Sequence, residues 1–299
     1  MLPSIYYLSS FAGAFFLGLT AVLLKLADVD NVFYGLIIRA CASGPPVLIL
    51  VLFLKDIISL NLFFNPIFIF ELVLAAAFLI CADMLIMTIL KRKPVGMIAP
   101  LIAVFPLFTT ILLIITKFAR FSPIILFFTS LIIVGVAMVT YERSDPESSQ
   151  ISFDLEAIGF GLIIAMFLGL TNYMDIIIIL SFTSLNGLVY TSFKFMMVLC
   201  LSSILFVLIH DHNDWKRFQS NQSSTLFLLA AGLSAWGFGS LLIYTAYDNS
   251  NPEIVNAIIG INPVFAVLIS ISLKMERLGI LKVVGLLLCV VASIGIVNI

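Results

Sequence analysis

The sequence predicts an all-α integral membrane protein with ten transmembrane helices in a 5+5 inverted repeat. The first observation is composition: 62% of the 299 residues are hydrophobic and 10% are charged, whereas soluble domains have about half and about a quarter. The second observation is that the apolar residues fall into runs as long as a bilayer is thick. The third is that a series of residues in the first half recurs in the second half.

Each apolar run is long enough to form one membrane-crossing helix. A bilayer core about 30 Å thick needs roughly 20 apolar helical residues, because a helix satisfies its own backbone polar groups. The first run has no basic segment before it and is too long for a signal-peptide core, so we expect it to be the first membrane helix. The ten runs are 4–24, 31–54, 67–90, 95–116, 122–141, 157–180, 185–209, 224–247, 253–273 and 279–298.

Turn-forming and charged residues separate these runs, as at 28–31, 91–94, 144–146 and 251–252. Strands of a membrane barrel would instead alternate apolar and polar residues over about ten positions. The sequence has no such alternation, so we expect helices throughout.

The two halves of the chain share an ordered series of residues. The segment FLGLT at 16–20 recurs at 167–171, an offset of 151. At an offset of 157, Pro106 corresponds to Pro263, Phe108 to Phe265, Lys117 to Lys274 and Arg120 to Arg277. Because five helices per half is an odd number, the second repeat enters the membrane from the opposite face, as in many transporters. We expect a first repeat at 1–142, a polar linker at 143–156 and a second repeat at 157–299.

The net charge and the absence of known catalytic motifs argue against several classes of function. A net charge of −1 argues against a nucleic-acid partner, which requires a basic surface. The sequence carries no hydrolase, zinc-protease or nucleotide-binding motif, so we expect neither an enzyme nor an ATP-driven pump, and no cofactor. His210, Asp211, His212 and Asp214 resemble metal ligands, but a solvated loop explains them better.

The four cysteines, Cys41, Cys81, Cys200 and Cys289, lie inside apolar runs. They have neither disulfide-framework nor zinc-site spacing. We interpret them as small buried hydrophobic residues.

Arg39, Asp83 and Lys194 lie well inside apolar runs, where a charge costs about 2.5–3.5 kcal/mol on insertion scales. Arg39 lies eight positions after Asn31, and Asp83 lies eight before Lys91, so both are about 12 Å below the same membrane face and able to meet. In one interpretation, Arg39 binds a carboxylate or phosphate of the solute, and Asp83 binds an ammonium group or a proton. The other is a purely structural ion pair between two helices.

Lys194 lies nine positions after Leu185, at a comparable depth from the opposite face. Its run is the repeat counterpart of the run that holds Arg39. Asp175 is the partner we expect, and the alternative is that Lys194 extends toward the headgroups.

Further polar and aromatic residues occupy depths at which lipid-facing positions would be aliphatic. The amide of Asn262 precedes Pro263, which removes one helical hydrogen bond and frees a carbonyl. An interfacial aromatic belt is the alternative for the tyrosines, whereas Trp236 lies too deep for it. The candidate cavity residues beside the three charged ones are Thr20, Asn172, Tyr173, Trp236, Tyr244, Asn256 and Asn262, and the neighbouring Thr171 and Tyr190 share these depths.

The sequence resembles the EamA-type transporters of the drug/metabolite transporter superfamily over its whole length. The resemblance rests on Lys25 after the first helix, Arg39, Pro263, the segment Glu276-Arg277-Leu278-Gly279, and Gly285 and Gly295 in the last run. It implies a ten-helix carrier or exporter of small metabolites, including amino acids, with relatives that exchange nucleotide sugars or phosphorylated sugars. Two departures are Ala119 where the second repeat has Glu276, and Leu19-Thr20 where a Trp-Asn type pair often follows the first-helix glycine.

We therefore expect a secondary carrier in the cell membrane that moves a small zwitterion or organic anion through a midplane cavity, with lipid around it. Protons are a possible coupling ion, with Asp83 as the group that would bind them. A channel-like facilitator and a non-transporting membrane subunit are the alternatives. The solute, the direction of transport and the oligomeric state stay open.

Loop charges and the family resemblance give opposite orientations. Ten lysines and arginines fall on the face reached after the first run and three on the other, which places both termini outside the cytoplasm. The resemblance instead implies both termini inside.

Overall fold

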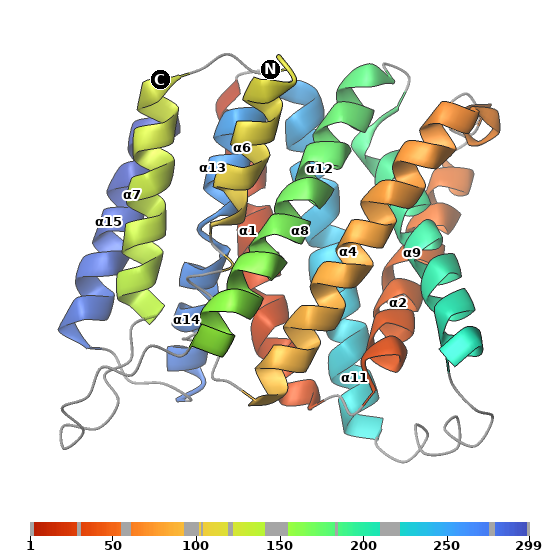
Figure 1. Cartoon of the computed structure of the whole chain (residues 1–299), viewed down its shortest axis with the longest axis horizontal. Helices are drawn as coiled ribbons and strands as arrows, with labels where there is room; N and C mark the ends of the chain where they lie inside the picture. The colour runs from red at the N-terminus through yellow and green to blue at the C-terminus, as the bar shows by residue number, and fades with distance from the viewer. Residues whose placement is uncertain are drawn as a thin grey trace.

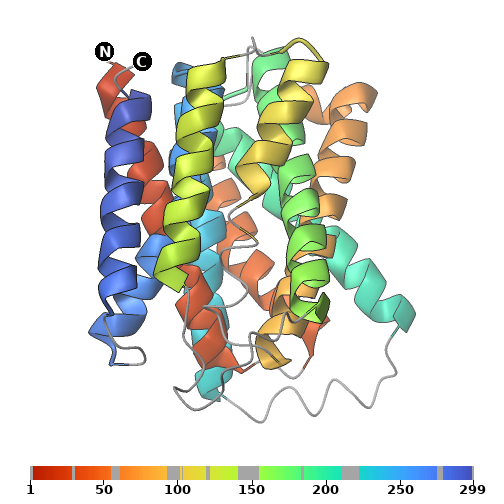
Figure 2. The same ribbon diagram turned by 60° about the vertical axis from the view of Figure 1, so that its left-hand side comes forward.

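The chain folds into a bundle of helices that run from one end of the molecule to the other (Figure 1). The computed structural model describes residues 3–28, 31–54, 61–92, 102, 104–118, 122–140, 155–182, 185–209, 222–274 and 279–297. All regular secondary structure in these ranges is helical, which confirms the predicted all-α class. Both chain ends lie at the same end of the bundle (Figures 1 and 2).

Each predicted apolar run contains a helix or a series of helices. Seven of them in the described residues are long and apolar enough to cross a membrane, and Phe105–Ile115, Pro123–Met138 and Val283–Ala292 are shorter apolar helices. The elements of the first half are α1 (Pro3–Ala27), α2 (Val32–Phe53), η1 (Asn61–Phe64), α4 (Pro66–Arg92), α6 (Phe105–Ile115) and α7 (Pro123–Thr140). Those of the second half are α8 (Leu155–Ser181), α9 (Gly187–Ile209), α11 (Gln222–Ala231), η2 (Gly232–Gly239), α12 (Ser240–Asn249), α13 (Pro252–Ile259), α14 (Asn262–Ser272) and α15 (Ile280–Val297).

The predicted helix at 253–273 is interrupted, which corrects the expectation of one continuous run. α13 ends at Ile259 and α14 begins at Asn262, with a turn between them. Pro263 has no N–H for the Ile259 carbonyl, and Asn262 Nδ2 donates to that carbonyl instead, at 3.1 Å. The freed carbonyl and its amide partner are thus as the sequence predicted.

Helices from the two halves are interleaved. α1 packs against α11, η2, α12 and α14, whereas α8 packs against α4 and α6. We call α1, α11–η2–α12 and α13–α14 the α1 group, and α4, α6 and α8 the α8 group. The pairs α2 with α9 and α7 with α15 also combine one helix from each half, and Figure 1 shows them at opposite sides of the molecule.

Two glycines allow close contacts between helices within these groups. A Cβ atom on Gly18 of α1 would lie 2.5 Å from the Asn262 carbonyl oxygen of α14. A Cβ atom on Gly169 of α8 would lie 3.1 Å from the Phe105 carbonyl oxygen of α6. Gly169 follows Gly18 by 151 residues, and Asn262 follows Phe105 by 157, so the two crossings use residues that match in the sequence series.

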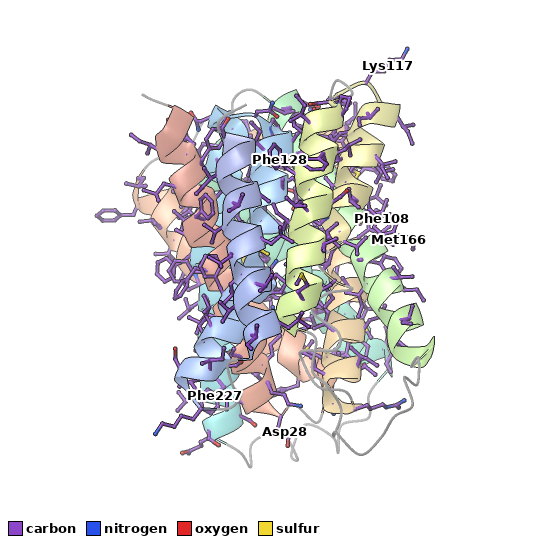
Figure 3. The ribbon with its side chains drawn as sticks, turned by 90° about the vertical axis from the view of Figure 1, so that its left-hand side faces the viewer. Asp28, Phe108, Lys117, Phe128, Met166 and Phe227 are labelled. Atoms are coloured by element: carbon purple, nitrogen blue, oxygen red, sulfur yellow. The ribbon has the colours of Figure 1, made fainter. Side chains whose placement is uncertain are left out.

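The ends of α6 and α14 are also alike. Lys117 and Lys274 have positive φ angles of 63° and 59°. The preceding amides of Thr116 and Leu273 each donate to the carbonyl four residues back, at 3.0 and 2.9 Å. α6 and α14 run toward opposite ends of the molecule (Figure 1), and Figure 3 shows Lys117 at the end opposite Asp28.

The interpretation of the cysteines as buried is wrong for three of them. Cys289 is buried, whereas Cys41, Cys81 and Cys200 are exposed on the helix surfaces. An apolar side chain needs no burial within the protein when the surrounding solvent is lipid. The His210–Asp214 cluster of the sequence prediction, Arg120 and Glu276 lie outside the described residues.

Candidate functional site

A cavity lies between the α1 group and the α8 group, bordered also by α2 and α9. Its empty volume is about 1160 Å³, counted out to open solvent. Most of its wall is leucine, isoleucine, alanine, phenylalanine and proline. The polar and titratable residues and the tryptophan that line it are Thr20, Arg39, Asp83, Thr171, Asn172, Asp175, Lys194, Trp236, Ser240, Tyr244 and Asn262.

Arg39 and Asp83 form the ion pair that their helix positions predicted. Arg39 Nη1 donates to Asp83 Oδ2 at 2.9 Å, and both residues are buried. Within the described part of the chain, Arg39 Nε is buried without a hydrogen-bond partner. The guanidinium therefore keeps hydrogen-bonding capacity, and its planar shape suits a carboxylate.

Trp236 holds the guanidinium from the other side. Arg39 Cζ lies 4.1 Å from the centre of the Trp236 ring, a cation–π distance, and Trp236 stacks on Phe195 with ring centres 5.1 Å apart. Trp236 belongs to the π-helical segment η2, whose first residue, Gly232, lies directly against the Arg39 backbone. Short π-helical segments often occur at functional sites, and here the segment carries the ring that covers Arg39.

Lys194 is buried and paired, so the expected partner Asp175 is confirmed and extension toward the headgroups is wrong. Lys194 Nζ lies 2.5 and 2.7 Å from the two Asp175 carboxylate oxygens. It also donates to Tyr244 Oη at 2.8 Å. Tyr244 and Tyr190 each donate a hydroxyl hydrogen to Asp175, at 3.0 and 2.6 Å. This network, which we call the Asp175 cluster, joins α8, α9 and α12.

Asn256 and Tyr173 are the two candidate residues that do not line the cavity. Asn256 is fully buried, accepts a hydrogen bond from Asn172 at 3.0 Å and donates to the Pro106 carbonyl at 2.9 Å. It thereby connects α13 to α8 and α6. Tyr173 is partly buried and packs against the main hydrophobic core.

The two matching threonines differ in their hydrogen bonds. Thr20 Oγ1 donates to the Phe16 carbonyl at 3.0 Å and lies 3.3 Å from the Ala231 carbonyl. Thr171 Oγ1 is buried and has no partner among the described residues. Because Thr171 lines the cavity, its hydroxyl is placed to hydrogen-bond a molecule inside it.

The cavity-wall residues that sequence reasoning did not name include Phe195 and Ser240. Ser240 follows Asp83 by 157 residues, so applying the repeat offset to Asp83 would have found it. Phe195 carries no such signal, because a phenylalanine in an apolar run is equally suited to contact lipid. Among the described residues no group of three or more His, Cys, Asp or Glu side chains could hold a metal ion.

Comparisons with known proteins agree with this architecture. Residues 155–298 match the model of the EamA-like transporter family. A crystal structure of another protein aligns with a TM-score of 0.72 over 98% of this chain and 96% of its own, at 14% sequence identity, which shows a shared fold. No curated protein matches the chain.

This match confirms the resemblance to EamA-type transporters that the sequence indicated, since the family is one of membrane transporters of the drug/metabolite type. Residues 155–298, nearly half of the chain, match the EamA-like transporter family, and the chain is a multi-pass integral membrane protein.

Proposed function

We propose that the protein is a secondary carrier of ten transmembrane helices in two inverted repeats of five. It moves small polar metabolites, such as amino acids or organic anions, by alternating access through the cavity between the α1 and α8 groups. The matching crossings of Gly18 and Gly169 and the matching ends of α6 and α14 support the inverted repeat. The moving bodies are then these two groups, rather than the two halves of the sequence.

The observation that carries the transport proposal is the Arg39–Asp83 pair in the cavity wall. Only one Arg39 nitrogen bonds Asp83 in the structure, and the adjacent Nε is unpaired among the described residues. A purely structural ion pair does not require an open cavity beside it. A solute-binding site requires both a cavity and hydrogen-bond donors that are not already occupied. Arg39 would bind the carboxylate of the solute, and Asp83 would bind its ammonium group.

The charges of the cavity limit which solutes are favourable. Its wall contains two cations, Arg39 and Lys194, and two carboxylates, Asp83 and Asp175, so the formal charges cancel. A net charge brought into an apolar site without a partner is costly. A zwitterion keeps the site neutral, as does an organic monoanion that enters while Asp83 takes a proton, whereas a dianionic phosphate ester does not.

Counterflow in proteoliposomes tests this proposal. Vesicles are loaded with amino acids, organic acids and sugar phosphates, and exchanged solutes are identified by mass spectrometry. We expect one solute class to exchange with the wild type and the exchange to be lost in Arg39→Ala. Thr129→Val is the matched control, because Thr129 lies on α7 outside the cavity and bonds within its own helix at 2.8 Å. It should exchange like the wild type.

The alternatives give different outcomes in the same vesicles. A channel-like facilitator would equilibrate the solute without counterflow. A non-transporting subunit would exchange nothing although the wild type is folded, and the Arg39–Asp83 pair would then be structural.

A role of Asp83 in proton coupling is tested by its isosteric variant. If Asp83 carries the proton, exchange by the wild type changes with pH, and exchange by Asp83→Asn is slower and independent of pH. A variant that is as fast as the wild type, with the same pH profile, would show that Asp83 carries no proton.

A further inference from the structure

The Asp175 cluster lies between the cavity and the end of the molecule that holds both termini. Asp175 is close to the last turn of α8, and Tyr244 is close to the last turn of α12, and both helices end at that side (Figure 1). Beyond the cluster, Tyr247, Val189 and Val255 are completely buried. The cavity is therefore closed at the termini end by a layer of side chains.

This layer joins the two helix groups through polar contacts. Asp175 belongs to the α8 group and Tyr244 to the α1 group, and they are joined at 3.0 Å. Lys194 bridges the same two residues from α9. The bond between Asn172 of α8 and Asn256 of α13 is a second connection between the groups in this half of the bundle.

The cavity continues toward the opposite end. Its wall reaches Leu24 and Leu90, which also border a hollow lined by Lys25, Asp28, Met87 and Lys91. Figure 3 shows Asp28 at this end of the molecule. Here Lys25, an exposed residue, donates to the Leu90 carbonyl at 3.2 Å, a bond of the kind that water replaces at little cost.

At the positions that the repeat relates to Asp175 and Tyr244, the chain has apolar residues. The repeat offset of 151 relates Asp175 to Leu24, and the offset of 157 relates Tyr244 to Met87. Arg39 matches Lys194 in its repeat run, but its carboxylate partner comes from α4 rather than α1. The cations thus follow the repeat, whereas their carboxylate partners do not.

We propose that the Asp175 cluster is a gate that closes the cavity on the termini face, and that the apolar residues Leu24 and Met87 at the repeat-related positions let the solute-free carrier rest open toward the Lys25 face. This inference rests on the proposed carrier function. Opening the termini face requires α8 and α12 to separate, which parts Tyr244 from Asp175. A hydrogen bond to a buried charged group is one of the stronger kinds, so its loss opposes opening until water or a solute replaces it. The side chains of Leu24 and Met87, at the matching positions, are apolar and form no such polar bond.

Distances between spin labels across the termini face test the gate. Labels on cysteines placed at Ser181 and Asn249, which are exposed at the ends of α8 and α12, report the separation of the two groups in a background without the four native cysteines. Asp175→Asn combined with Lys194→Gln removes the ion pair without changing the net charge. We expect a single short distance in the parent protein and an added longer component in the double variant.

The matched control is Asp83→Asn combined with Arg39→Gln, which removes the other ion pair of the same cavity. We expect it to leave the Ser181–Asn249 distance unchanged. An unchanged distance in the Asp175/Lys194 variant, or equal opening in the Asp83/Arg39 variant, would overturn the gate. Tyr244→Phe removes only one hydroxyl, so we expect a long-distance component of smaller amplitude. This variant keeps the test decisive even if the double variant does not fold.

The measurement needs no solute, so it is separate from the counterflow experiment. A protein that exchanges nothing but opens in the Asp175/Lys194 variant retains the gate and loses the proposed function. A protein that exchanges solute but does not open in that variant retains the function and loses the gate.

Discussion

The two buried cations are held in different ways. Lys194 has three oxygen partners within 2.8 Å, two of them on Asp175 and one on Tyr244. Arg39 has a single carboxylate bond at 2.9 Å and the face of Trp236. Removing one partner of a buried pair costs about 3–5 kcal/mol, because the other charge is left behind.

Asp83→Asn should therefore lower the thermal unfolding temperature, because Arg39 loses the one carboxylate bond that it has among the described residues. Adding Arg39→Gln removes the stranded charge and should restore much of that loss. Thermal unfolding of the four proteins of this double-mutant cycle measures the coupling. A double variant that loses the sum of the two single losses would mean that the residues do not interact.

Trp236→Leu should weaken solute binding, because the ring fixes the guanidinium that would receive the carboxylate. A cation–π contact contributes about 0.5–2 kcal/mol, so we expect the half-saturating solute concentration to rise about 2- to 30-fold. Trp236→Phe keeps an aromatic face and should have a smaller effect. Equal effects of the two variants on half-saturation would show that the ring does not act through Arg39.

At the scale of helices, the crossings of α1 with α14 and of α8 with α6 depend on two glycines. Gly18→Ala and Gly169→Ala place a methyl group against a neighbouring helix, so both should lower the unfolding temperature. Gly159→Ala is the control on α8, because nothing lies within 4 Å of its added Cβ and alanine favours a helix over glycine by about 1 kcal/mol. An unfolding temperature that falls as far in Gly159→Ala would contradict the packing role.

The break between α13 and α14 gives a second prediction at this scale. Pro263→Ala restores an N–H that the Ile259 carbonyl can accept in place of the Asn262 amide. We expect a higher unfolding temperature and slower exchange, because the interrupted helix would become continuous beside the cavity. A faster exchange rate in the proteoliposome assay would show that the break does not assist movement.

For the whole molecule, the orientation of the bundle remains a prediction of the loop charges. The loops of the Lys25 face hold ten lysines and arginines and those of the other face hold three, which places the Lys25 face in the cytoplasm. An impermeant thiol reagent on intact cells should then label a single cysteine at Ser59 and spare one at Ser148. Labelling at Ser148 alone would reverse the assignment and favour the orientation that the family resemblance implies.

The positions of the helices and the pairing of the buried charges were predictable from the sequence. The packing of the helices against one another was predictable to a smaller extent. Arg39 and Asp83 were paired correctly because helix geometry converts position into depth, and Lys194 was paired with Asp175 for the same reason. The interleaving of the two halves depends on long-range contacts, as at Gly18 and Gly169, which no local pattern reveals. Asn256 was placed in the cavity because depth alone does not fix which way a side chain faces.

The balance of charge within the cavity has an electrical consequence. Moving one elementary charge across a membrane changes its energy by about 2.3 kcal/mol per 100 mV. Arg39 with Asp83 and Lys194 with Asp175 form two pairs of zero net charge, so a pair that moves as a unit transfers no current. The reorientation rate of the empty carrier would then not depend on the membrane potential. A current measured during transport would report the net charge of the transported solute.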